Sequence, residues 1–137
     1  MTGELFFNTH PHVDEERLVS QWLAWQPRAV LVMNNPGLAL RLQDLRPEAL
    51  VIVRQTPDDT VRDLGSPAEW LARMVATVPD ARVVLYAGNE RHASPGIGAW
   101  TLEAMRLATA AGRRLCILNT GTGGPEDEEW WAGMPPT

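Results

Sequence analysis

Polar side chains follow each of five short apolar runs in the sequence, at the positions where predicted strands would end. The runs cover residues 5–7, 29–33, 49–53, 83–86 and 115–118. The polar residues after them that could contact a ligand are Asn8, His10, Asn34, Arg54, Asn89, Glu90, His92 and Asn119. In parallel β/α proteins the carboxyl ends of the strands converge on one rim, where ligands bind. We therefore expect a shared site at this rim, whereas a purely structural interpretation treats each residue as the polar start of a loop.

Helical signals separate these apolar runs. Asp14 can cap a helix that extends to about residue 26, and Asn35 precedes a first-turn proline that opens a helix to about residue 45. Ser66 and Glu69 form a capping box, and Gly112 can end a helix that begins near residue 97. The runs themselves are rich in β-branched and aromatic residues with little polar alternation, as in parallel strands that are covered on both faces.

Two α/β architectures fit this alternation. The first is a partial TIM-type (β/α) barrel with five parallel strands and four to five helices, in which residues 1–137 form a single partial-barrel domain. The second is an open doubly wound parallel sheet. Composition fits both architectures, and we expect the first because of the residues at the strand ends.

The stretch Tyr86-Ala-Gly-Asn-Glu90, in which an Asn-Glu pair closes the fourth strand, resembles the fourth strand of retaining glycoside hydrolases built on a (β/α)8 barrel. The stretch 100–123 resembles the helix and strand that follow in such barrels, and the resemblance covers about five-eighths of a barrel. It implies that Glu90 is the general acid/base and that Asn89 binds the sugar 2-hydroxyl. The family usually continues Asn-Glu-Pro, and Arg91 replaces that proline here.

A carboxyl group at a strand end, partly enclosed by apolar residues, has its ionisation disfavoured and its pKa raised. Glu90 could then protonate a glycosidic oxygen near neutral pH. The structural alternative is that this carboxylate caps its own loop or pairs with Arg91. The remaining rim candidates, expected to hold sugar hydroxyls, are Asn8, His10, Asn34, Arg54, His92 and Asn119.

The sequence offers no clear second catalytic carboxylate. Retaining hydrolysis needs two carboxyl groups about 5 to 5.5 Å apart, and the family's nucleophile lies on the seventh strand, whereas the apolar runs here stop at the fifth. We therefore expect little activity from this chain alone. It would be a fragment of a barrel enzyme, a half-barrel that associates with itself or another chain, or a sugar-binding rim without turnover. The rival interpretation is a non-catalytic self-associating or binding domain.

Composition limits the partners. The formal net charge of −5 argues against nucleic-acid binding, and no apolar segment reaches the length of a membrane span. The N-terminus lacks a signal-peptide pattern, so we expect a cytoplasmic protein. We expect neither a cofactor nor a metal. The single Cys116 lies in an apolar run, so we expect it to be buried. Open sheet edges and six tryptophans predict a homodimer that covers those edges. The resemblance to glycoside hydrolases implies a carbohydrate as the small-molecule ligand.

Overall fold

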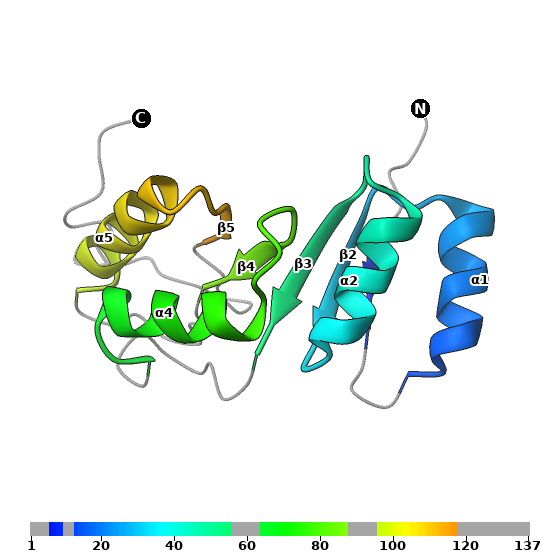
Figure 1. Ribbon diagram of the computed structural model, residues 1–137, viewed down its shortest axis with the longest axis horizontal. Coiled ribbons are helices and arrows are strands. Elements are labelled where there is room, and N and C mark those ends of the chain that lie inside the picture. The colour runs from blue at the N-terminus through cyan, green and yellow to red at the C-terminus, as the bar shows by residue number, and fades with distance from the viewer. Residues whose placement is uncertain (1–5, 10–12, 56–63, 88–95, 118–137) are drawn as a thin grey trace, which may run out of the picture.

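The predicted strands and helices form one parallel sheet with helices packed against it (Figure 1). The computed structural model describes residues 6–9, 13–55, 64–87 and 96–117. The strands are β1 (Phe6–Asn8), β2 (Ala29–Met33), β3 (Leu50–Arg54), β4 (Val84–Tyr86) and β5 (Leu115–Cys116). The helices of the described ranges are α1 (Glu15–Trp25), α2 (Pro36–Leu45), α4 (Pro67–Thr77) and α5 (Ile97–Ala110). Every neighbouring pair of strands is parallel, so the predicted α/β class is confirmed.

The strands lie side by side in the order in which they occur in the chain, β1-β2-β3-β4-β5. A doubly wound sheet reverses its strand order at a switch point. The described sheet has no such reversal, so its order favours consecutive units of a barrel. Among the described residues no pairing joins β1 to β5, and this part of the sheet is therefore open.

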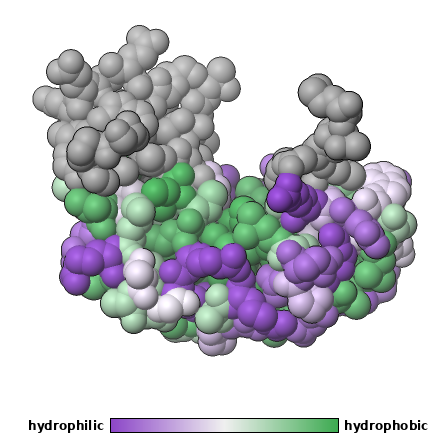
Figure 2. All heavy atoms as spheres, turned by 90° about the horizontal axis from the view of Figure 1, so that it is seen from above, coloured by the Kyte–Doolittle hydropathy of each residue, from purple (hydrophilic) through white to green (hydrophobic). Residues whose placement is uncertain are grey.

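The two faces of the sheet have different surroundings. The residues that face the helices are fully buried: Val30, Val32, Val51, Val53 and Leu85. The alternating residues on the opposite face, called the open face below, are mostly half-buried: Leu31, Met33, Ile52, Arg54, Tyr86 and Cys116. Figure 1 shows α2 and α4 in front of the strands. Figure 2 shows apolar surface in green near the middle of the described part, between more hydrophilic flanks. In a closed barrel the open face would be the packed interior.

Tryptophan side chains connect neighbouring helices of the helical layer. Trp22 of α1 is fully buried, and its Nε1 donates to the carbonyl oxygen of Leu42 at 3.0 Å. Trp70 of α4 meets Trp100 of α5 edge to face, with ring centroids 5.4 Å apart, and Trp100 Nε1 donates to the Gly65 carbonyl oxygen at 2.9 Å. Aromatic pairs of this geometry add stability beyond the apolar area that they bury.

The helix ends agree with the capping residues predicted from the sequence. The side chains of Asp14 and Asn35 accept from backbone N–H groups in the first turns of α1 and α2. Ser66 and Glu69 form the reciprocal capping box of α4. Gly112, with φ of 69°, follows α5 in the left-handed conformation. Within the described ranges, none of the helices combines the length and the apolar composition needed to cross a bilayer.

Candidate functional site

The described part of the predicted rim consists of the ends of five parallel strands. Asn8, Asn34 and Arg54 lie there, at the ends of β1, β2 and β3. The other five predicted site residues lie outside the described residues: His10, Asn89, Glu90, His92 and Asn119. The structure therefore describes the floor of the proposed site, which the strand ends form. Among the described residues of this floor, Arg54 has a positively charged side chain.

Arg54 and Tyr86 form a side-chain contact on this floor. Val53 pairs with Leu85, so the next residues, Arg54 and Tyr86, lie side by side and point to the open face. The Arg54 guanidinium lies 5.3 Å from the centroid of the Tyr86 ring, in a cation–π contact. Sequence reasoning did not name Tyr86 as a site residue. Its signal was an aromatic residue with a hydroxyl group at the end of an apolar run.

Asn34 connects the ends of β2 and β3 through its backbone. Its φ of 51° is left-handed, a conformation that asparagine tolerates better than most residues, and its N–H donates to the Arg54 carbonyl oxygen at 2.9 Å. Its side chain is exposed. The next residue, Asn35, has a structural role, because it caps α2 and its Nδ2 donates to Glu15 Oε1 at 2.7 Å. The backbone of Asn34 therefore has a structural role in the turn after β2. Ligand binding by its side chain stays a prediction.

Asn8 is not next to the Arg54–Tyr86 pair. It pairs with Leu31 on β2, which in turn pairs with Ile52, so Asn8 lies two strands away from β3. With neighbouring strands about 4.8 Å apart, this separates the backbones of β1 and β3 by about 10 Å.

Four carboxyl groups of the described residues have a lowered pKa, which is the opposite of what a general acid needs. Arg41, Arg82 and Arg106 lower the pKa values of Glu16, Asp80 and Glu103, respectively, by hydrogen bonding to them. For Glu48 the lowering of the pKa comes first from its own backbone N–H and then from Arg46. These carboxylates stay ionised near neutral pH and none lies on the rim. The described residues also contain no group of three or more His, Cys, Asp or Glu side chains that could hold a metal ion.

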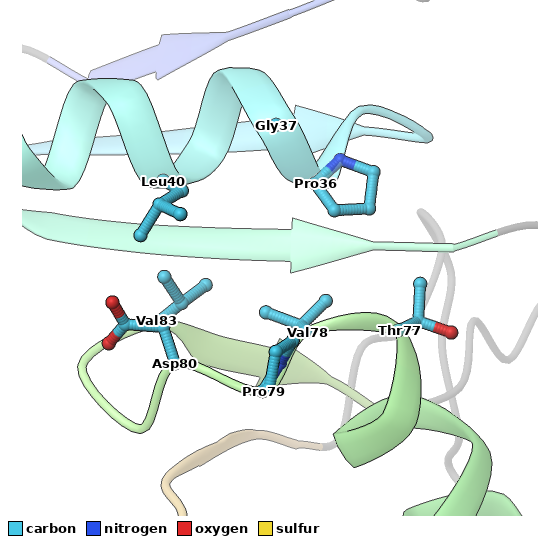
Figure 3. A pocket seen from close by; sticks show the side chains of 8 residues that line it. All are labelled: Pro36, Gly37, Leu40, Thr77, Val78, Pro79, Asp80 and Val83. Carbon is cyan, nitrogen blue, oxygen red and sulfur yellow. The ribbon is translucent and has the colours of Figure 1, made fainter.

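A separate groove lies on the helix-covered side of the sheet, between α2 and the segment that follows α4 (Figure 3). Its volume is about 210 Å³, and its walls are mainly apolar side chains such as Leu40, Val78 and Val83. The carboxylate of Asp80 lies in its lining and is hydrogen-bonded to Arg82. The groove thus offers mainly apolar contact surface, and none of the predicted site residues lines it.

Comparisons of the chain with protein-family models, curated proteins and solved structures found no match. The resemblance to barrel glycoside hydrolases stays a prediction that depends on the Asn89-Glu90 pair and on its place in the strand count.

Proposed function

We propose that the chain is a glycoside hydrolase-like partial barrel whose strand-end rim faces a carbohydrate, with Glu90 as the general acid/base. The observation that carries this proposal is the unreversed strand order, in which β4 is the fourth of five consecutive parallel strands. Asn89 and Glu90 follow Tyr86, the last residue of β4, within four positions of the sequence. The acid/base occupies this place in the family that the sequence resembles.

The chemistry of the rim floor supports a carbohydrate ligand. A tyrosine ring offers a flat apolar surface to the carbon–hydrogen bonds of a pyranose and a hydroxyl group to its oxygens. The guanidinium of Arg54, beside the Tyr86 ring, carries five N–H donors that suit sugar hydroxyls. The exposed side chain of Asn34 adds an amide, which both donates and accepts.

Turnover by this chain alone would be weak. Both hydrolytic mechanisms need a second carboxyl group across the scissile bond, and no described strand end carries one. The residues named here would then bind and orient the sugar and protonate the leaving oxygen. A nucleophile would have to come from a residue outside the described ranges or from another chain.

A panel of aryl glycosides tests the catalytic part of this proposal. We expect slow turnover of at least one substrate, reduced about 100-fold or more in Glu90→Gln, because general acid catalysis contributes that much. Glu103→Gln is the matched control, because Glu103 is paired with Arg106 on α5 and should not affect turnover. Equal turnover in wild type and Glu90→Gln would contradict the role of Glu90.

A non-catalytic self-associating domain is the second candidate. The observation in its favour is the apolar open face, on which Leu31, Met33 and Ile52 are only half-buried. This candidate predicts no turnover and no saturable sugar binding in either wild type or Glu90→Gln. Saturable sugar binding that is weakened in Arg54→Gln would favour the carbohydrate rim instead.

A further inference from the structure

Arg54 lies at the centre of the described rim. Met33 of β2 pairs with Arg54, and on the other side Arg54 is next to Tyr86 of β4, because Val53 pairs with Leu85. Neighbouring strands are about 4.8 Å apart, so the ends of β2, β3 and β4 form one continuous strip of the floor. Arg54 and Tyr86 are only half-buried, and both therefore keep part of their surface accessible to a ligand.

This strip carries a positive charge. The last residues of the described strands include one charged residue, Arg54, and no carboxylate: they are Asn8, Met33, Arg54, Tyr86 and Cys116. The four carboxylates with a lowered pKa lie on helices or in the segments before β3 and β4. The net charge of −5 works against long-range attraction of an anion, so selection would depend on the short contact with Arg54. Charge complementarity at the described strand ends favours an anionic ligand.

The chemistry of Arg54 and Tyr86 indicates the kind of anion. Guanidinium N–H donors form a planar fork that binds both oxygens of a carboxylate, whereas a sugar hydroxyl has a single oxygen. The Tyr86 ring, with its centroid 5.3 Å from the guanidinium, places a flat apolar surface beside this fork. A sugar ring that carries a carboxylate would use both side chains at once. Arg54 has five N–H donors, so the carboxylate contact is compatible with its other interactions.

We propose that the rim selects an acidic sugar, a hexuronic acid, through contact of its carboxylate with Arg54. This inference rests on the proposed carbohydrate function and adds the class of sugar to it. The carboxylate would accept two hydrogen bonds from Arg54, and the pyranose would lie against the Tyr86 ring. A sugar phosphate fits less well, because it carries up to two negative charges and three strong acceptor oxygens, and the described strand ends offer one cation to them.

Matched pairs of methyl glycosides test this inference. Each pair consists of a neutral hexoside and the uronide that carries a carboxylate in place of the exocyclic hydroxymethyl group, in the gluco, galacto and manno configurations. NMR titration of the backbone ¹H–¹⁵N signals of Asn34 and Tyr86 gives both dissociation constants on the same protein. The measured quantity is their ratio. A partly unfolded variant does not change this ratio, because unfolding weakens the apparent binding of both ligands equally.

We expect wild type to bind the uronide of at least one pair at least about tenfold more tightly than the matching hexoside, because a hydrogen bond to a charged group contributes at least that factor. Arg54→Gln keeps N–H donors but loses the charge, and should bring the ratio close to one. Arg54→Lys should retain part of the preference, because lysine keeps the charge without the fork. Arg41→Gln is the matched control. It removes the same charge from an exposed ion pair with Glu16 on the helical layer, and should keep the full preference.

The results distinguish failure of this inference from failure of the carbohydrate function. Equal binding of hexoside and uronide by wild type would overturn the inference and leave the carbohydrate rim in place. Absence of saturable binding for every glycoside would overturn both. A preference that persists in Arg54→Gln, or that is lost equally in Arg41→Gln, would overturn the role of Arg54. An equal response to acetate at the same ionic strength would overturn the selection of a sugar.

Discussion

Arg46 shows how one polar side chain can hold several segments of this fold together. Its Nη1 donates to the Pro27 carbonyl oxygen at 2.6 Å, and its guanidinium lies 4.5 Å from the centroid of the Trp22 ring. Nearby, Nε2 of the buried Gln43 donates to the carbonyl oxygen of Ala49 at 3.1 Å. These contacts fix the loops that lead into β2 and β3. In (β/α)8 barrels, residues at the amino-terminal ends of the strands contribute to stability, whereas residues at the carboxyl ends bind ligands.

Replacement of Arg46 should therefore destabilise the protein more than replacement of a surface arginine. We expect Arg46→Met to lower the free energy of unfolding by about 1–3 kcal/mol, because the Pro27 carbonyl loses its donor and Trp22 loses its cation–π contact. Arg41→Met is the control, because Arg41 forms an exposed ion pair with Glu16 and should matter little. Urea unfolding of both variants gives the comparison. Equal destabilisation by the two substitutions would contradict the proposed difference.

At the same scale, the sequence predicted where residues lie in the fold better than which residues they contact. Arg54 was placed on the rim because it follows an apolar run, and it does lie at the end of β3. Its contact with Tyr86 could not be predicted, because that contact depends on the register between β3 and β4. Cys116 was expected to be buried within its apolar run. It is half-buried instead, because β5 ends the described sheet and Cys116 points to the open face.

At the scale of elements, helix starts were the most predictable features. A capping residue acts on the backbone N–H groups two or three residues later, so all the information lies within one turn. Strand limits were less predictable. The third strand was expected at 49–53 and is observed at Leu50–Arg54, because the Ala49 N–H donates to the Arg46 carbonyl in a turn and Arg54 pairs with Met33. Hydrogen bonding to neighbouring strands sets these limits. The apolar pattern of the sequence does not show which residues form those hydrogen bonds.

The capping box of α4 should contribute measurably to stability. Ser66 Oγ accepts from the Glu69 N–H at 3.2 Å, and Glu69 Oε2 accepts from the Ser66 N–H at 3.2 Å. We expect Ser66→Ala to lower the free energy of unfolding by about 0.5–2 kcal/mol. Ser20→Ala, at an exposed position inside α1, should be neutral or slightly stabilising, because alanine is the better helix former. Thermal unfolding of the two variants measures the difference. An unchanged midpoint for Ser66→Ala would show that α4 does not depend on this cap.

At the scale of the whole molecule, the order of the strands could not be predicted from local pattern. Both candidate architectures consist of the same strand–helix units, and they differ only in where each unit is placed beside the previous one. The apolar runs were expected to be covered on both faces. The described helices cover one face, and residues such as Leu31 and Ile52 on the other face remain half-buried. That combination suits a sheet whose second face closes on itself or on a partner.

We predict from this arrangement that the chain associates with a second copy through the open face. β1 and β5 each have one neighbour in the described sheet, and unpaired edges favour contact with another chain. We expect wild type to form dimers at high concentration in sedimentation velocity experiments. Leu50→Lys should weaken the dimer by about tenfold or more, because Leu50 is 36% exposed on the open face and its contact with a partner would bury an apolar side chain.

Leu45→Lys separates this effect from a general change in charge. Leu45 is 41% exposed at the end of α2, on the helical layer, and gains the same charge upon substitution. The dimer should persist in Leu45→Lys and dissociate in Leu50→Lys. Equal weakening by both substitutions would mean that charge, and not the open face, controls association. A strictly monomeric wild type would mean that the open face is satisfied within one chain.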